Sequence, residues 1–262
     1  MADGPDVAMK GTKSRFLAWN IRDGGAARLP MILHEVKKLD PDFITFSEVW
    51  GTYLRELIDG LSAIGLPYIE TRCPEGNLNS VIVASKMPLV VQDDEIKRDP
   101  ERWLPVQVPS LSLSALCVHI PDATASVARK QEFWFEVMRW AQKHKHERAL
   151  LLGDFNTGMN DIDKTRNGTA LKLWENIPAL RIEGYRDVWR LVNPKNREYT
   201  WFTWRNGKEL NGFRLDHIYV SSELRDFIVD ARHIHHVRGL VDAGGLSDHA
   251  MIVADLAVAP EC

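Results

Sequence analysis

Residues 150–158 read Leu-Leu-Leu-Gly-Asp-Phe-Asn-Thr-Gly, an apolar run of strand length that ends in a glycine and two polar side chains. Side chains two residues apart in a strand share a face, so Asp154 and Asn156 should leave the end of a buried strand together. A carboxylate beside a carboxamide can take a proton from a water molecule and hold its oxygen. The same residues also suit an Asx turn without a chemical role, because Asp, Asn, Thr and Gly are all turn residues. The ends of the other strands decide between these two interpretations.

Several other apolar runs also carry polar residues at their ends. We expect strands at 15–22, 43–46, 111–120, 215–220 and 251–258. The polar residues at their ends are Asn20, Glu48, His119, Asp216 and the pair Asp248 and His249. One such residue would mean little, but one at nearly every strand end indicates a rim lined with carboxylates, amides and imidazoles.

The remaining pattern predicts about ten short strands and four or so helices. Helical spacing of apolar residues indicates helices at 29–39, 52–64 and 127–144, with a short helix near 170–174. In the 127–144 helix the expected buried stripe is Phe133, Trp134, Val137, Met138 and Trp140. Strands and helices do not strictly alternate, which favours an α+β sandwich of two sheets with helices outside over a doubly wound parallel sheet.

Length and composition are those of a soluble globular protein. The 262 residues suit one β-rich domain at 14–262 behind a loose N-terminal tail at 1–13. A formal net charge of -3 argues against a non-specific nucleic-acid coat protein, although a local basic cleft with a metal can still bind phosphate. We find no signal sequence and no run of membrane-spanning length, so we expect a cytoplasmic protein without stable membrane association. We also expect a monomer.

The candidate ligands indicate the class of metal. Carboxylate and amide oxygens suit Mg²⁺ or Mn²⁺ better than zinc. The three cysteines form no Cys-x-x-Cys pair and no His-x-x-x-His is present, which argues against zinc, and we take His235 and His236 as ordinary surface or core histidines. Acyl transfer and nucleotide-loop chemistry also lack support, because there is no Gly-x-Ser-x-Gly, P-loop or Gly-x-Gly-x-x-Gly motif.

Six short motifs occur in an order that resembles the endonuclease–exonuclease–phosphatase superfamily. They are Trp-Asn-Ile-Arg at 19–22, Ser-Glu-Val at 47–49, His-Ile-Pro-Asp at 119–122, Gly-Asp-Phe-Asn at 153–156, Arg-Leu-Asp-His-Ile at 214–218 and Leu-Ser-Asp-His at 246–249. The resemblance extends from about Phe16 to the C-terminus. It implies a four-layer α/β/β/α sandwich of two mixed β-sheets flanked by helices, and a divalent metal, Mg²⁺ or Mn²⁺.

The resemblance also implies which residues hold the metal. Glu48 corresponds to the principal ligand. Asn20 corresponds to its neighbour, which helps to hold the metal and Asp154. Asp248 resembles a second metal-site or outer-shell carboxylate. The metal would lower the pKa of its bound water and stabilise charge on the phosphate.

The remaining motif residues correspond to groups that act on the water and the phosphate. Asp154 corresponds to the group that orients or deprotonates the attacking water, and Asn156 to one that steadies the water or the phosphate. His249 corresponds to an imidazole that contacts the phosphate, and Asp216 to the carboxylate that fixes its tautomer. His119 corresponds to a second phosphate-facing imidazole, which donates a hydrogen bond or helps the leaving oxygen depart.

Some expectations lie outside these motif roles. We leave open whether Glu70 or Glu75 is a carboxylate partner of His119, and we expect Arg129 and Lys130 at the start of a helix to be solvated. For Trp201 and Trp204, a position in the core and a position lining the cleft are equally good interpretations. With both included, the expected substrate-binding residues are Arg22, Asn79, Trp201, Trp204 and Arg214.

These features predict a metal-dependent phosphodiesterase that hydrolyses nucleic acid, with DNA favoured, as an endonuclease or exonuclease. Segments 199–204 and 211–216 resemble exonuclease III and apurinic endonucleases, but His119 stands where those enzymes usually carry Tyr. Their Gln-Glu-Thr-Lys is Ser-Glu-Val-Trp at 47–50, which argues against abasic-site specificity. Two alternatives remain: an enzyme for a small-molecule or lipid phosphate, similar to sphingomyelinases, and a catalytically silent binding module on the same scaffold.

Overall fold

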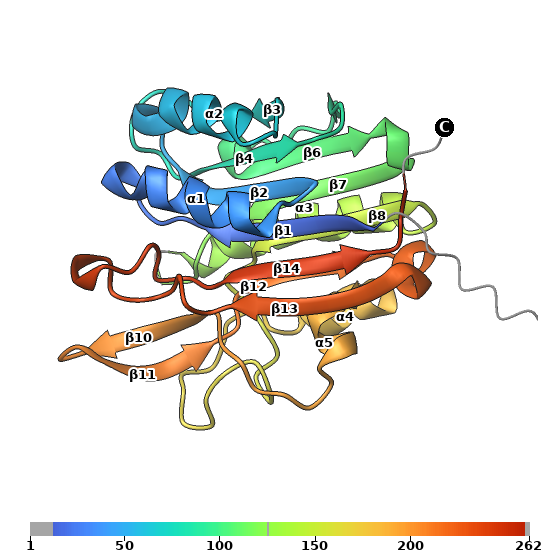
Figure 1. The fold of residues 1–262 in the computed structure, drawn as a ribbon. Coiled ribbons are helices and arrows are strands. Elements are labelled where there is room, and N and C mark those ends of the chain that lie inside the picture. The colour runs from blue at the N-terminus through green and yellow to red at the C-terminus, as the bar shows by residue number, and fades with distance from the viewer. Residues whose placement is uncertain (1–12, 125, 260–262) are drawn as a thin grey trace, which may run out of the picture.

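Two six-stranded β-sheets pack face to face in the computed structural model, which describes residues 13–124 and 126–259 (Figure 1). The first sheet has the order β13 (Ile228–Ile234), β14 (Met251–Leu256), β1 (Ser14–Asn20), β2 (Phe43–Val49), β4 (Ser80–Ser85) and β3 (Tyr68–Thr71). The second has the order β5 (Val90–Val91), β6 (Trp103–Val108), β7 (Leu113–His119), β8 (Arg148–Asp154), β12 (Asp216–Val220) and β9 (Arg186–Asp187). A separate hairpin, β10 (Trp201–Arg205) and β11 (Lys208–Phe213), projects from the sandwich.

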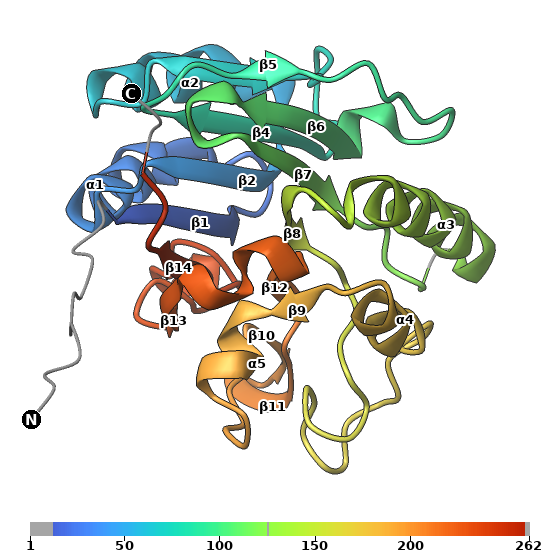
Figure 2. The same cartoon turned by 90° about the vertical axis from the view of Figure 1, so that its right-hand side faces the viewer.

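Helices cover the two outer faces of the sandwich (Figure 2). The first sheet buries one apolar layer under α1 (Leu29–Leu39) and α2 (Leu54–Ala63), and the second buries another under α3 (Val127–His144) and α4 (Asn176–Ile182). A third apolar layer lies between the sheets. The short α5 (Val188–Val192) packs against β12 and β13. The predicted four-layer α/β/β/α architecture is therefore confirmed.

Strand directions bring the polar strand ends to one side of the molecule. β1 runs parallel to β2, and β7 runs parallel to β8, so each pair delivers two carboxyl ends together. β14 is antiparallel to β1, and β12 is antiparallel to β8, so the starts of β14 and β12 lie at the same edges as those carboxyl ends. Both sheets are mixed, as expected, and their motif-bearing ends form one rim.

The sequence pattern located most elements and missed several. The bounds predicted for α3, residues 127–144, agree with the structure. The helix expected near 170–174 is wrong, because residues 172–175 form a turn and α4 begins at Asn176. β6 and β11 were not predicted. The proposed tail lies outside the described residues except for Lys13, and the domain boundary stays a prediction. No helix among the described residues is long and apolar enough to cross a membrane.

Candidate active site

The strand that ends at Asp154 lies at the centre of the rim. In the sheet register Asp154 is opposite His119 on β7 and opposite Asp216 on β12. Gly153 is needed for this packing, because its φ is 134° and a Cβ there would lie 2.0 Å from the carbonyl oxygen of Val118. Only glycine combines that backbone angle with so close a neighbouring strand.

The carboxylate of Asp154 is buried and surrounded by donors. Its Oδ1 accepts the Asn156 backbone N–H at 2.8 Å, which closes the Asx turn that the sequence suggested. Its Oδ2 accepts the Asn20 side-chain amide at 3.0 Å and lies 3.4 Å from the amide nitrogen of Asn156. Burial, and then the charge of Asp216, raise the pKa of Asp154. The turn and the chemical interpretation of these residues are therefore compatible.

His249 forms a buried ion pair with Asp216. Its Nδ1 lies 2.9 Å from Asp216 Oδ2. Burial alone would lower the pKa of His249, but the adjacent Asp216 carboxylate outweighs it and raises the pKa. Because Nδ1–H donates to Asp216, Nε2 is the ring nitrogen left to face a substrate. This geometry is the one expected from the sequence for a carboxylate that fixes an imidazole tautomer.

The Nδ1 atom of His119 contacts an arginine instead of a carboxylate. Its Nδ1 lies 3.1 Å from Nη1 of Arg102, and a guanidinium can only donate. The hydrogen of the neutral ring is therefore on Nε2, which lies 3.8 Å from Asp154 Oδ2. Burial, and then the charge of Arg102, hold the pKa of His119 well below its usual range. Among the described residues neither Glu70 nor Glu75 contacts this ring, so Arg102 occupies the position considered for them.

Glu48 owes its position to a β-bulge. The register between β2 and β4 shifts between Ser47 and Val49, and Glu48 between them has a φ of 58°. Left-handed backbone is uncommon outside glycine and often marks a functional constraint. The bulge turns the Glu48 carboxylate toward the rim, where Oε1 accepts the amide of Asn20 at 3.1 Å and Oε2 accepts the Asp23 N–H at 3.2 Å.

The carboxylate oxygens of the rim are suitable ligands for a hard divalent cation. Glu48, Asp154 and Asp248 line one cavity, and Asp216 Oδ1 is buried without a hydrogen-bond partner among the described residues. Three carboxylates that line one cavity favour a bound cation there, and oxygen ligands suit Mg²⁺ or Mn²⁺. Asn20 directs its amide nitrogen toward Glu48 and Asp154, while its oxygen accepts the Arg22 N–H at 3.0 Å. As oriented, Asn20 bridges the two carboxylates and presents no oxygen to a metal.

The structure brings most of the predicted residues into one cavity of about 640 Å³. Trp201 lines it and donates from its indole nitrogen to Asp248 Oδ2 at 3.0 Å, which favours the cleft interpretation for this tryptophan. Asn79 also lines it and accepts from the Trp50 indole at 2.6 Å. The predicted residues in its wall are Glu48, Asn79, His119, Asp154, Asn156, Trp201, Asp248 and His249.

Four other residues that we expected at the site do not line the cavity, and each has a different position. Arg22 is partly exposed, with Nη1 3.9 Å from Asp248, at the edge of the site. Asp216 acts through His249, as described above. Trp204 lies on the projecting hairpin, away from the cavity wall. Arg214 is 1% exposed and engaged by Asp163 and Asp187, so the structure does not bring its guanidinium to the cavity.

Lys130 and Arg102 also line this cavity, although the sequence pattern did not place them there. Lys130, expected to be solvated, is 1% exposed, and its Nζ bonds the carbonyl oxygen of Asn156. Burial lowers the pKa of Lys130 to about 8, against the opposing charge of Asp154. Helical spacing could have found it, because Lys130 precedes the buried Trp134 by four residues and therefore lies on the same face. Arg102 lies after a weakly patterned charged stretch, and no sequence signal marks it.

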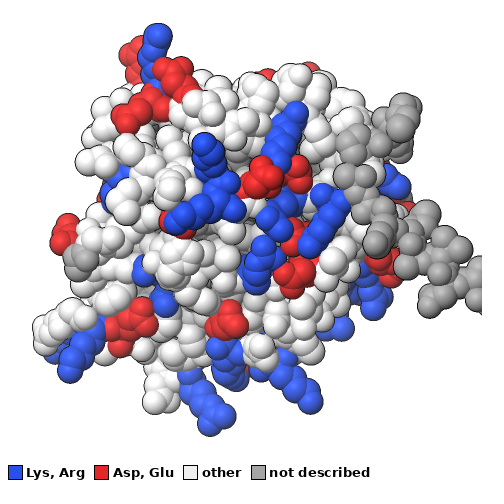
Figure 3. All heavy atoms as spheres, in the orientation of Figure 1, with Lys and Arg blue, Asp and Glu red and all other residues white. Residues whose placement is uncertain are grey.

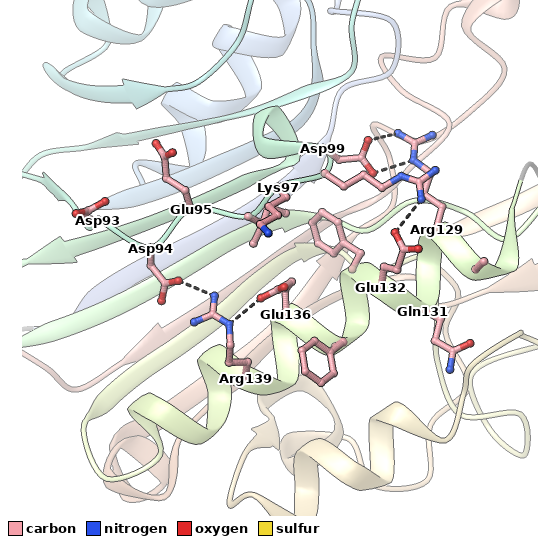
Figure 4. A pocket seen from close by; sticks show the side chains of 15 residues that line it. Asp93, Asp94, Glu95, Lys97, Asp99, Arg129, Gln131, Glu132, Glu136 and Arg139 are labelled. Carbon is pink, nitrogen blue, oxygen red and sulfur yellow. Dashed lines mark hydrogen bonds and ion pairs between the residues drawn. The ribbon is translucent and has the colours of Figure 1, made fainter.

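A larger hollow of about 850 Å³ lies between residues 93–99 and α3 (Figure 4). Its charged side chains neutralise one another: Arg139 lies 2.6 Å from Asp94, and Arg129 lies 2.8 Å from Asp99. On the face shown in Figure 3, acidic and basic side chains are likewise interspersed, without an extended patch of one sign. Neither the hollow nor this face gathers catalytic groups, so the rim cavity is the candidate active site.

Comparisons with known proteins identify the family of this chain. The model of the Endonuclease/Exonuclease/phosphatase family matches residues 17–249. Exodeoxyribonuclease III of Haemophilus influenzae is 29% identical over 145 residues, which cover 48% of this chain and about half of that relative, 53%.

Solved structures share the fold. A 3′-5′ exonuclease (NExo) from Neisseria meningitidis superposes with a TM-score of 0.79 at 21% identity, covering 92% of this chain and 99% of that one. An AP endonuclease from Archaeoglobus fulgidus gives 0.77 at 20% identity, with 92% and 98% covered. At such identities the likeness concerns the fold, while the family match extends from β1 almost to β14. The chain therefore belongs to the Endonuclease/Exonuclease/phosphatase family.

Proposed function

We propose that this chain is a divalent-metal-dependent hydrolase that cuts phosphodiester bonds in nucleic acid, with DNA as its substrate and Mg²⁺ or Mn²⁺ as its cation. One observation carries the proposal: the buried Asp154 lies between the imidazoles of His119 and His249 in a cavity that Glu48 also lines. A binding module would have no need for a carboxylate base and two differently protonated imidazoles at one point.

Asp154 is the group we assign to proton transfer from the attacking water. Its raised pKa makes it a stronger base than an exposed aspartate, and the amides of Asn20 and Asn156 hold it in place. Glu48, with Asp248 nearby, would hold the divalent cation, which supplies neutralisation of the charge on the phosphate oxygens.

The two imidazoles are assigned to the phosphate. His249, kept protonated by Asp216, would present Nε2–H as a charged donor, and charged donors form the stronger hydrogen bonds. His119 would present Nε2–H from a neutral ring, because Arg102 holds its other nitrogen. Donors fixed before the reaction stabilise charge that develops in the transition state, and removing one costs about 10²–10³ in rate.

DNA is favoured over other phosphodiesters for two reasons. The curated relative is named exodeoxyribonuclease III. In addition, the indole of Trp201 lies in the cavity wall, where an aromatic ring can stack on a base. The expected cytoplasmic location and monomeric state stay predictions.

A terminal phosphate monoester is the second candidate substrate. Arg102 places a guanidinium behind His119, where it adds positive charge to the cavity, and a monoester dianion carries more negative charge than an internal diester. This observation favours removal of a phosphate from a DNA end as a further reaction of the same site.

The proposal is tested by assaying the purified chain with MgCl₂ and with EDTA. The substrates are supercoiled plasmid, duplex oligonucleotides ending in 3′-hydroxyl or 3′-phosphate, and bis(p-nitrophenyl) phosphate as a generic diester. We expect metal-dependent cleavage of DNA that is far faster than cleavage of the generic ester. Asp154→Ala and His249→Ala should each lose activity by about 10²-fold or more.

His236→Ala is the matched control, because its side chain is 66% exposed and pairs only with Glu35 among the described residues. This variant should keep full activity. Equal activity of all three variants and the wild type, or DNA cleavage that persists in EDTA, would exclude the proposed mechanism.

A further inference from the structure

A second cluster of potential metal ligands lies outside the active-site cavity. Glu198 precedes β10, His233 is in β13, and His235 follows that strand. Both imidazoles contact the same carboxylate, that of Glu198. Its Oε2 lies 3.2 Å from His233 Nδ1 and 3.0 Å from His235 Nε2.

The spacing of these three atoms suits a tetrahedral metal ion. Ligand bonds of about 2.0–2.1 Å at tetrahedral angles put neighbouring ligand atoms about 3.3 Å apart. The two oxygen–nitrogen distances are already close to that value, and all three atoms lie within 4.8 Å of one another. Two imidazole nitrogens with one carboxylate oxygen suit zinc and other late first-row ions, and suit Mg²⁺ poorly.

One residue of the cluster is buried, and the other two are partly exposed to solvent. The His233 side chain is fully buried and stacks on Trp189, with 4.7 Å between ring centroids. Glu198 and His235 are each 38% exposed, which gives an ion a path from solvent and a water a place beside it.

We propose that Glu198, His233 and His235 form a zinc-type transition-metal site that is separate from the active centre. The bound ion would fasten the segment before β10 to the end of β13. That segment continues to Thr200, whose Oγ1 accepts the backbone N–H groups of Leu215 and Asp216. The site would therefore stabilise the part of the chain that supports Asp216 and Trp201.

Binding should be weaker than at a closed structural zinc site. Such sites use four protein ligands, whereas this one offers three and leaves a position for water. The nitrogens that would not bind the metal, His233 Nε2 and His235 Nδ1, have no hydrogen-bond partner among the described residues. In known sites the second nitrogen of a ligating imidazole usually has such a partner. The alternative arrangement is a metal-free triad in which both rings donate to Glu198.

The test is titration of the whole chain with ZnCl₂ and with CoCl₂ in excess MgCl₂, which would compete for the proposed cation site of the active centre and suits the new site poorly. Zinc affinity and stoichiometry come from calorimetry, tetrahedral coordination comes from the visible spectrum of Co²⁺, and stabilisation comes from thermal unfolding. Glu198→Gln and His235→Ala remove one ligand each from partly exposed positions. His236→Ala is the control, one residue away.

The wild type and His236→Ala should bind one zinc ion, show the tetrahedral Co²⁺ spectrum and unfold at a higher temperature with zinc. Glu198→Gln and His235→Ala should bind it about tenfold more weakly or worse. Their metal-free unfolding temperatures show whether they are folded. Equal zinc affinity in all four proteins, or no zinc binding in excess Mg²⁺, would overturn the proposal and leave the metal-free triad. DNA cleavage plays no part in these readouts, and the comparison of Glu198→Gln and His235→Ala with the wild type holds whether or not the active centre binds Mg²⁺.

Discussion

Replacement of Arg214 by methionine should strongly destabilise the protein. The guanidinium is buried, with Nε 2.8 Å from Asp163 and Nη1 2.6 Å from Asp187. Methionine fills similar space but leaves both carboxylates without this cation. Asp163 keeps Arg190 at 2.6 Å, whereas Asp187 keeps only the ring of His217 at 2.9 Å as a side-chain partner among the described residues.

The magnitude follows from the burial of the unpaired carboxylate. Removing one partner of a buried ion pair costs about 3–5 kcal/mol, a large part of the 5–15 kcal/mol that is usual for a folded protein. For a chain of this size the melting temperature should fall by on the order of 10 °C. Arg55→Met, at a side chain 95% exposed, should change stability by less than about 0.5 kcal/mol.

Urea unfolding of four proteins isolates the charge: the wild type, Arg214→Met, Asp187→Asn and the double variant. Asparagine can still cap α5, where Asp187 accepts the Arg190 N–H, so the substitution mainly removes the charge. Asp187→Asn should destabilise the wild type but be neutral or stabilising beside Arg214→Met, with a coupling of about 1–3 kcal/mol. The reasoning is refuted if Arg214→Met unfolds at the same urea concentration as Arg55→Met, or if Asp187→Asn has equal effects in both backgrounds.

Three further predictions follow from single contacts. Gly153→Ala would put a Cβ 2.0 Å from the carbonyl oxygen of Val118 at a φ of 134°, so its urea midpoint should fall sharply, and an unchanged midpoint would show that the strands can separate there. Burial would raise the pKa of Asp255, but hydrogen bonds from Arg15 and its neighbours outweigh this and lower it to about 2. Since that is below the unfolded value of about 3.9, the stability it contributes should be lost as pH falls from about 4 to 2, and Asp255→Asn should flatten that loss in urea titrations against pH. Glu48→Gln should raise the Mg²⁺ concentration for half-maximal cleavage by about tenfold or more, whereas an unchanged metal requirement would place the cation elsewhere.

The spacing of apolar residues predicts an element correctly where those residues are the ones that the element buries. The helix at α3 was predicted with correct bounds because Phe133, Trp134, Val137 and Trp140 recur on one face and are all buried. β6 was missed because Pro105 interrupts it and charged residues precede it. β11 was missed because Lys208, Glu209, Asn211 and Gly212 are poor strand formers, and the strand forms by pairing with the other arm of a hairpin.

The site was more predictable than the surrounding network. Residues at strand ends meet because the strands are neighbours in the sheets, and the sequence motifs indicate which residues stand at those ends. The partners of buried charges come from distant positions, however. Arg214 was expected at the substrate, yet its guanidinium is bound by Asp163 and Asp187, 51 and 27 residues earlier. Arg102, which contacts Nδ1 of His119, is a similar case. Sequence spacing does not indicate which side chain contacts a given imidazole nitrogen.

The most direct test of the proposed metal-dependent active centre is a crystal structure of the protein soaked in MnCl₂, read from the anomalous signal of the ion. We predict a peak in the rim cavity within bonding distance of the Glu48 carboxylate. Strong manganese peaks elsewhere with none near Glu48, Asp154 or Asp248 would contradict the account.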